Sequence, residues 1–122
     1  MKIKISPIST NKMFYGVHKR TKDHREWEDE FLWKTKRLCK KTIKDPVCLI
    51  IDFRIKNDKK TDIDNLLKAS LDGLVKAGFI KDDRLIHTLL VFKSKTKTKE
   101  DESIEFYFAK SLIDYIYFNT HL

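Results

Sequence analysis

The chain has few of the residues that cross-link a fold or that interrupt its helices and strands. Its 122 residues include only two Cys, two Pro and three Gly. Cys39 and Cys48 form no CxxC pair and have no His at metal-ligand spacing, which argues against a disulfide framework and a zinc site and fits a reducing compartment. With 41% hydrophobic residues and so little Gly and Pro, residues 1–122 are expected to fold as one domain.

Long apolar runs are also absent. No stretch approaches the roughly 18 apolar residues of a membrane span, and the opening MKIKIS lacks the apolar segment of a signal peptide. A cytoplasmic protein without a membrane partner is therefore expected. Acidic residues are outnumbered, because 26 Lys and Arg against 18 Asp and Glu leave a net charge of +8. This balance suits a partner of phosphate polyanions, although charge alone does not exclude an ordinary basic protein.

The hydrophobic pattern predicts four strands and two helices. Residues 2–5 alternate as a half-buried strand does, and Asp23 with Glu26 predicts the start of a helix that continues to about Ile43. A second helix is expected to begin near Asp62 and to end at Gly78. The remaining segments, 47–55, 84–92 and 103–109, are rich in strand-forming residues, and the last two are expected to form a hairpin.

These elements predict an α+β fold in the order β-α-β-α-β-β, with one mixed sheet and two covering helices. The tail, residues 110–122, is apolar and aromatic without a clear period. It is expected to pack on another surface, for which a second subunit is one candidate.

Acidic residues gather around the second predicted helix. If the chain is still extended at Asp62, the spacing of two lets Asp62 and Asp64 project to one side. Asp82 and Asp83 follow the helix, and a sheet that returned this turn beside the helix start would crowd the carboxylates together. A hard cation would offset that repulsion, and Mg²⁺ prefers such oxygen ligands.

Three residues form a polar stripe on the same helix. Asp64, Lys68 and Asp72 stand at positions i, i+4 and i+8. A solvated row of ion pairs is the more common meaning of such a stripe. Beside a metal, however, Lys68 would supply a cation that offsets charge as a phosphodiester is cleaved or that positions the attacking water.

Basic residues flank the acidic segment. If residues 93–99 are extended, their lysines form a comb on one side that fits a phosphate backbone, although a charged hairpin tip would look the same. An earlier basic segment includes His18 and His24 and is either a DNA contact or a solvated loop. His87 is more typical of an ordinary sheet residue than of a ligand. The candidate DNA-binding residues are Lys56, Lys59, Lys60, Lys93, Lys95, Lys97, Lys99, Lys19 and Arg20.

The segment DIDNLLKASLDGLVKAGFIKDD, residues 62–83, resembles the signature of the RusA-type Holliday junction resolvases. That signature reads D-[LI]-D-N-L-x-K-x-x-x-D-x-L-x-x-A-G-x-[LIFW]-x-D-D. The PISTN segment, with Pro7, Ser9 and Asn11, is similar to the family's N-terminal P-x-S-x-N loop. The resemblance covers most of residues 3–109, whereas the aromatic tail and the basic first helix have no counterpart in it.

The resemblance implies the roles of particular residues. The family's metal-binding aspartates fall on Asp62, Asp64 and Asp83, and its catalytic lysine falls on Lys68. Supporting roles are implied for Asn65, for Asp72, which would hold Lys68 or Arg84 in place, and for Asp82 near the metal ligands. The implied enzyme is a homodimeric crossover junction endodeoxyribonuclease that requires Mg²⁺, for which Mn²⁺ is expected to substitute.

The implied reaction is the paired nicking of a four-way DNA junction. A twofold dimer presents two identical sites, so strands of like polarity are each cut once. Metal-activated water attacks phosphorus and the 3′ oxygen leaves. Two alternatives stay open: a nuclease for flaps or replication intermediates, and a non-catalytic nucleic-acid-binding module whose carboxylates only cap the helix.

Overall fold

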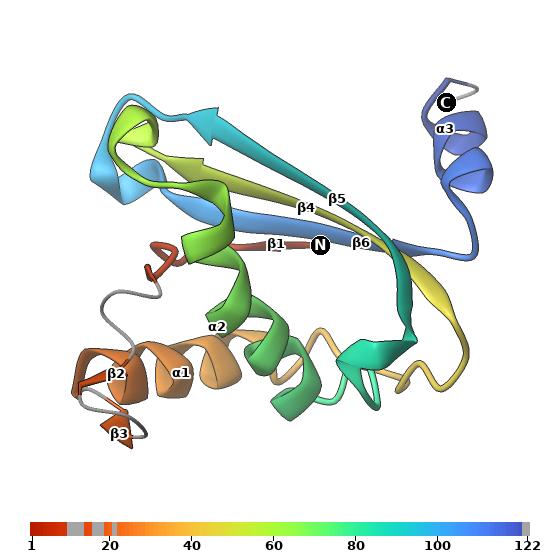
Figure 1. Cartoon of the computed structure of the whole chain (residues 1–122), viewed down its shortest axis with the longest axis horizontal. Coiled ribbons are helices and arrows are strands. Elements are labelled where there is room, and N and C mark those ends of the chain that lie inside the picture. Colours follow the sequence, from red (N-terminus) through yellow and green to blue (C-terminus); the bar gives the residue numbers. More distant parts are fainter. Residues whose placement is uncertain (10–13, 16–18, 21, 121–122) are drawn as a thin grey trace.

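The computed structural model describes residues 1–9, 14–15, 19–20 and 22–120, together with the side chains of these residues except at 14–15, 19–20 and 117–120. Four strands form one sheet in the order β1-β6-β4-β5, and two helices cover one of its faces (Figure 1). The elements are β1 (Lys2–Ile3), β2 (Phe14–Tyr15), β3 (Lys19–Arg20), α1 (Lys22–Thr35), β4 (Val47–Ile55), α2 (Ile63–Lys76), β5 (Ile86–Lys95), β6 (Ser103–Ala109) and α3 (Leu112–Thr120). The predicted mixed sheet and its two covering helices are confirmed.

Strand β4 is the middle of the sheet because it is apolar on both faces for most of its length. It pairs in parallel with β5 and antiparallel with β6. Leu49, Ile51 and Phe53 point to the helix side and are completely buried. They meet Phe31 of α1 and Leu66 of α2 in one core. Burial of these side chains supplies the main driving force that fixes α2 on the sheet.

The predicted hairpin of the last two strands is wrong. Strand β6 pairs with β4 and not with β5. The helix α2 makes a crossover that brings β5 in parallel beside one edge of β4, which leaves the other edge for β6. The third main strand also begins at Ile86 and not at Arg84, because Asp83–Leu85 forms a short 3-10 turn.

Helix α1 is shorter than predicted. It ends at Thr35, whose Oγ1 donates a 2.8 Å hydrogen bond to the carbonyl oxygen of Phe31. Leu38, which the predicted helix to about Ile43 would have included, therefore lies in a turn and is 39% exposed. Helix α1 begins at Lys22, so Asp23 lies within its first turn and does not precede it. The C-terminal stop predicted for the second helix is confirmed, because Gly78 has a φ of +86°.

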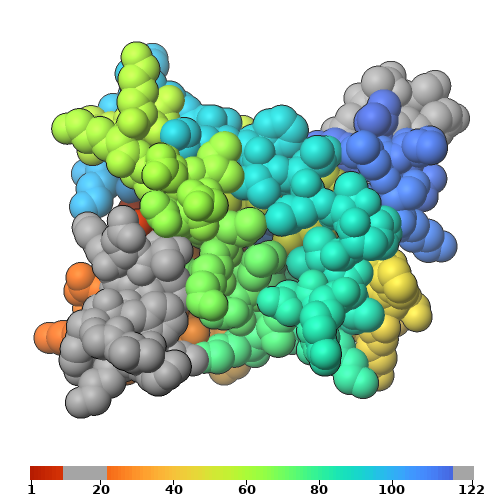
Figure 2. All heavy atoms as spheres, in the orientation of Figure 1, coloured from red at the N-terminus to blue at the C-terminus, as the bar shows by residue number. Residues whose placement is uncertain are grey.

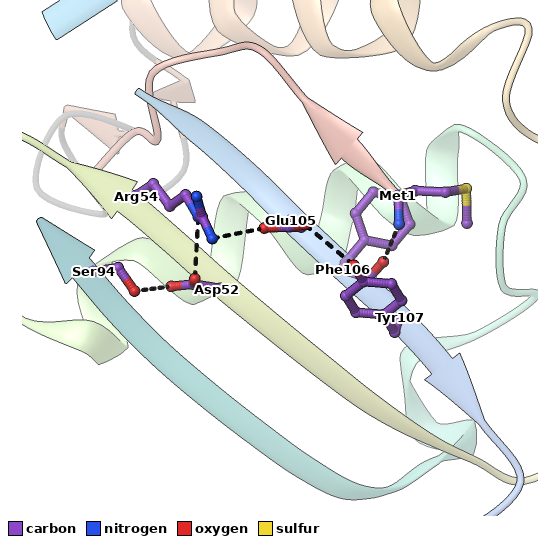
Figure 3. A network of polar contacts seen from close by, with 7 residues as sticks. All are labelled: Met1, Asp52, Arg54, Ser94, Glu105, Phe106 and Tyr107. Atoms are coloured by element: carbon purple, nitrogen blue, oxygen red, sulfur yellow. Dashed lines mark hydrogen bonds and ion pairs between the residues drawn. The ribbon is translucent and has the colours of Figure 1, made fainter. Parts of the chain in front are cut away.

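The other face of the sheet carries a polar network (Figure 3). Asp52 accepts hydrogen bonds from Arg54 Nε at 3.3 Å and from Ser94 Oγ at 2.8 Å. The guanidinium of Arg54 also pairs with Glu105 at 3.2 Å, and Tyr107 donates to the same carboxylate at 3.1 Å. Asp52 and Glu105 are thus engaged with one arginine and are poor candidates for a separate site.

The tail contains a helix that its irregular pattern did not predict. Helix α3 follows β6 and stands away from α1 and α2 (Figure 1). The ring of Tyr115 lies 6.3 Å from that of Tyr107. Ile113 and Ile116 are 78% and 51% exposed. No helix in the described part of the chain is long and apolar enough to cross a membrane.

Candidate active site

Asp62 and Asp64 lie where extended chain turns into α2. Asp62 has φ −76° and ψ 143° and occupies the N-cap position, but its carboxylate makes no capping hydrogen bond. Asp64 is in the first turn, and both side chains are exposed. The condition on which the predicted pair depended, an extended residue at Asp62, is therefore met. A carboxylate that does not cap its own helix keeps its lone pairs for another ligand.

A cavity of about 410 Å³ opens beside Asp62. The buried side chains of Ile55 and Leu66 are among the apolar residues that line it. The polar residues that line it are Ser9, Asn57, Lys60, Thr61, Asp62, Asn65 and Glu102. Lys59 and Lys60 belong to a short 3-10 turn, Asp58–Lys60, so this entrance to α2 combines carboxylate, amide and ammonium groups.

Lys68 is exposed on α2, one turn after Asp64. Figure 2 shows the surface of α2 in green, between the 56–62 segment and β5 in teal. Within the described part of the chain, no ion pair joins Lys68 to Asp64 or Asp72. The stripe is therefore not a row of i, i+4 salt bridges, which was the common alternative meaning of the pattern.

Asp83 lies at the other end of α2. With Asp72 and Asp82 it lines a cavity of about 390 Å³ that also includes Lys76 and Lys81. The turn is held there because the chain reverses at Gly78 immediately after the helix. Asp72, which lines this cavity with Asp83, lies two helical turns after Asp64, or about 12 Å farther along the helix axis.

Asp82 is committed to its neighbour Arg84. Its carboxylate accepts hydrogen bonds from the Arg84 side chain at 2.8 Å and 3.1 Å and from the Arg84 backbone N–H at 2.9 Å. The side-chain bonds, and after them the backbone bond, lower the pKa of Asp82 from 3.8 to about 2. Arg84 is thus held by Asp82, and the suggestion that Asp72 holds it is wrong.

These residues are of the chemical type that binds a divalent cation, but within the described part of one chain they are not arranged around a single ion. Asp carboxylates are the oxygen ligands that such ions prefer. Among the described residues, however, no three His, Cys, Asp or Glu side chains are arranged to hold one ion. The expectation that the turn after the helix returns to the helix start is wrong for the single chain, because backbone pairing of Ile80 with Ile43 keeps that turn at the far end.

The predicted DNA-binding lysines fall into different settings. Lys93 donates from Nζ to the carbonyl oxygen of Thr61 at 2.7 Å. Strand β5 ends at Lys95, Lys97 lies in a bend and Lys99 begins a 3-10 turn, so the single extended comb over residues 93–99 is wrong. The backbone N–H of Lys56 donates a 2.9 Å hydrogen bond to the Glu102 carboxylate, and the ammonium group takes no part in this bond.

Residues of the N-terminal segment are only partly described. Lys19 and Arg20 form β3, which pairs with Phe14 and Tyr15 in β2. His18, a candidate DNA contact, lies outside the described residues, as does Asn11 of the PISTN segment. His24 does not belong to a loop that could bind DNA, because it is 1% exposed and its Nε2 lies 3.8 Å from Glu28 of the same helix.

Two residues beside the site were not predicted. Asn57 and Glu102 line the cavity at Asp62 although they come from segments far apart in the chain. Asn57 lies in the turn after β4. No local pattern marks Glu102, because only the pairing of β6 with β4 brings the segment before β6 to the entrance of α2. The positioning contact of Lys93 with Thr61 likewise depends on tertiary structure.

Comparison with known proteins finds a family that matches most of the chain. A family described as endodeoxyribonuclease RusA matches residues 5–105. The chain is also 36% identical over 75 residues to the crossover junction endodeoxyribonuclease RusA of Aquifex aeolicus (strain VF5). That alignment covers 61% of this chain and 60% of the relative, so it spans less than two thirds of the relative's length. Because the family match includes most of the sheet and all of α2, the chain belongs to the RusA endodeoxyribonuclease family.

Proposed function

We propose that the chain is a single-domain, cytoplasmic endodeoxyribonuclease that acts as a homodimer on branched DNA, with the four-way junction as its substrate. The supporting findings are membership of the RusA family and the name of the relative, which refers to crossover junctions. Asp62, Asp64, Asp83 and Lys68 are the proposed catalytic residues. Asn65, Asp72 and Asp82 are proposed to support them.

The observation that carries this proposal is the arrangement of Asp62, Asp64 and Lys68 at the start of α2. Asp62 precedes the helix without capping it, Asp64 follows within one turn, and Lys68 is exposed without an ion pair in the described structure. A module that used these carboxylates only to stabilise α2 would place the Asp62 carboxylate on a backbone N–H of the first turn. Its absence there favours a site for an external ligand.

The site is proposed to be completed by a second copy of the chain. Within one chain the entrance at Asp62 and the turn at Asp83 lie at opposite ends of α2. If two copies pair with their α2 helices antiparallel about a twofold axis, the entrance of one helix lies beside the final turn of the other. Each of two identical sites would then contain Asp62 and Asp64 from one copy and Asp83 from its partner.

The same helix offers an apolar contact for such a pair. Ile63, Leu67 and Leu71 recur every four residues beside the polar stripe, and we call them the apolar stripe. Ile63 is 38% exposed, and Leu67 and Leu71 are only half-buried. A partner helix seated here would remove this surface from water. Ile113 and Ile116 of α3 are also exposed, so the tail is the second proposed dimer contact.

The protein groups contribute binding and charge. A bound Mg²⁺, or Mn²⁺ in its place, would supply a Lewis acid for the phosphate and lower the pKa of water. The lysines of the entrance, Lys56, Lys59 and Lys60, bind the phosphate backbone and hold the reacting strand over Asp62 and Asp64. The Lys68 ammonium group stabilises the negative charge that develops on the phosphate oxygens.

The test uses synthetic four-way, flap and linear DNA with the purified chain and with Asp64→Asn. With Mg²⁺ we expect paired symmetric nicks in the four-way DNA and none in EDTA. Asp64→Asn should bind the junction with unchanged affinity and cut it at least about 100-fold more slowly, because a missing charge at a metal ligand leaves the ion weakly held. Asp58→Asn, which changes a nearby half-buried carboxylate outside the proposed site, is the matched control and should cut normally.

Each alternative predicts a different result. Comparable cutting of flaps and four-way DNA would replace the junction with branched DNA in general. Metal-dependent binding without any cutting, or equal cutting by the chain and by Asp64→Asn, would contradict the proposed active site. Binding without either metal dependence or cutting would favour the non-catalytic module.

A further inference from the structure

The connection from α1 to β4 is strongly basic. Residues 36–44, which we call the basic linker, contain no Asp or Glu, and the next carboxylate along the chain is that of Asp45. The side chains of all five cations in this linker are exposed. They are Lys36, Arg37, Lys40, Lys41 and Lys44. This is the densest run of positive charge between α1 and the core strand β4.

No ion pair among the described residues neutralises the charges of the basic linker. Lys22 and Lys34 of α1 pair with Glu26 and Glu30, and Lys76 of α2 pairs with Glu28. By contrast, the ion pairs among the described residues include none of the five linker cations. Unpaired cations at this density produce a local positive potential that an anionic partner would reduce.

The basic linker is fixed against the turn that follows α2. Ile43 and Ile80 form a parallel bridge, in which the Ile43 N–H donates to the Phe79 carbonyl and the Lys81 N–H donates to the Ile43 carbonyl, both at 2.9 Å. This turn leads directly to Asp82 and Asp83. The backbone pairing therefore holds the linker beside the Asp83 end of α2 (Figure 1).

A hollow beside the linker continues toward Asp83. Lys36, Lys40 and Lys41 line a cavity of about 570 Å³ that extends to Lys76 and Gly78 at the end of α2. Lys76 also lines the cavity that contains Asp83. Lys76, whose ammonium group pairs with Glu28, thus lines both the cavity at Asp83 and the cavity at the linker.

We propose that the basic linker binds the phosphate backbone of a DNA arm that leaves the Asp83 end of the site. The spacing of charges favours this partner, since duplex DNA presents a phosphate along each strand at intervals that several exposed lysines can contact together. The inference rests on the proposed nuclease function, because it assigns a second DNA contact to the same substrate. It extends the DNA-binding surface away from the entrance lysines to the opposite end of α2.

The experiment compares two triple variants that remove equal charge. Lys36→Gln, Lys40→Gln and Lys41→Gln are combined in the linker variant. Lys2→Gln, Lys4→Gln and Lys22→Gln are combined in the control, which lowers the net charge of +8 by the same three units. Binding to a four-way junction is measured across a range of salt concentrations in EDTA, so the result does not depend on cutting.

We expect the linker variant to bind about tenfold or more weakly than the unmodified chain at moderate salt, and the control to lose less than about threefold. The slope of log Kd against log salt should fall by about 0.9 for each phosphate contact that is lost. Lys36→Arg, Lys40→Arg and Lys41→Arg together should restore both values. Equal weakening by the linker and control variants, or none by the linker variant, would overturn the proposal.

A second measurement uses the unmodified chain and avoids any folding defect of the variants. Lysine acetylation is quantified by mass spectrometry with and without the junction. We expect DNA to protect Lys36, Lys40 and Lys41 by about tenfold while Lys2 stays reactive. Unchanged reactivity of all three linker lysines in the complex would also overturn the proposal. Metal-dependent cutting is scored separately, so failure of this contact and failure of the nuclease function give different results.

Discussion

Lys93 donates a 2.7 Å hydrogen bond from Nζ to the backbone carbonyl oxygen of Thr61, the residue before Asp62. The two residues are 32 positions apart, one on β5 and the other at the end of the loop that enters α2. The bond therefore holds the chain at the point where extended backbone becomes helix. Lys93 thus influences the proposed site through the position of Asp62 as well as through its charge.

Replacement of Lys93 by Met should lower the rate of cutting at saturating DNA by about 10- to 100-fold, because residues that orient metal ligands have effects of this size. Junction affinity should change by less than about threefold, since only one cation is lost. Lys95→Met is the matched control on the same strand and should keep the saturated rate. Equal effects of both variants on rate would contradict the positioning role of Lys93.

The contact between Asp82 and Arg84 predicts an acid-sensitive group. Because the pKa of Asp82 is lowered from 3.8 to about 2, its carboxylate stabilises the folded chain fully above pH 3.8. This contribution is lost as the pH falls from 3.8 toward 2. An NMR titration of the Asp82 carboxyl carbon should show the low pKa, and Arg84→Ala should return it toward 3.8. Lys81→Ala should leave it unchanged, and an unaltered pKa in Arg84→Ala would contradict the assigned cause.

Gly73 is required for close packing of α2 on α1. A Cβ at this position would lie 2.9 Å from two ring atoms of Phe31, which is completely buried and stacks on Trp27 at 5.1 Å. Gly73→Ala gains about 1 kcal/mol of helix propensity but overpacks a site where the ring cannot move, at a cost of about 1–3 kcal/mol. We expect a net loss of about 1 kcal/mol in the free energy of unfolding, measured with urea.

The control for this prediction removes the obstructing ring. In a Phe31→Leu background, which is itself less stable, Gly73→Ala should be neutral or stabilising because the clash is gone. A double-mutant cycle isolates the coupling between the two positions. Equal destabilisation by Gly73→Ala in both backgrounds would show that contact with Phe31 is not the reason for the glycine.

The dimer contact can be assigned with two exposed isoleucines. Ile63→Lys places a charge in the apolar stripe of α2, and Ile113→Lys places one on α3. If the stripe forms the contact, Ile63→Lys should weaken dimerisation by about tenfold or more, because burial of an unpaired ammonium group is costly. Ile113→Lys should have little effect. Sedimentation equilibrium measures both, and the reverse pattern would assign the contact to the tail.

The parts of the fold that depend on local pattern could be predicted from the sequence. The buried character of β4, the α2 helix and its stop at Gly78 follow from side-chain periodicity and from the backbone freedom of glycine. The pairing of β6 with β4, and not with β5, depends on which strand edge α2 leaves open after its crossover. Local pattern does not contain that information, so the hairpin was predicted incorrectly.

The candidate site shows the same division. The entrance residues Asp62 and Asp64 are close in sequence, and the motif placed them correctly at the junction of loop and helix. The position of Asp83 depends on the pairing of Ile43 with Ile80, two residues from segments that no motif connects. The early end of α1 at Thr35, whose hydroxyl donates to a carbonyl oxygen of the same helix, could not be predicted either. The helical spacing of apolar residues continues beyond this position.

The central claim is that Asp64 of one copy and Asp83 of another serve the same site. Asp64→Asn and Asp83→Asn, each inactive alone, are mixed, unfolded and refolded together so that mixed dimers form. A mixed dimer then contains one site with both substitutions and one site with neither, so nicking of the four-way junction should return in the mixture. Because about half of the refolded dimers are mixed if pairing is random, the recovered activity should be about a quarter of normal. No recovery in a mixture shown to contain mixed dimers would contradict a site shared between two copies.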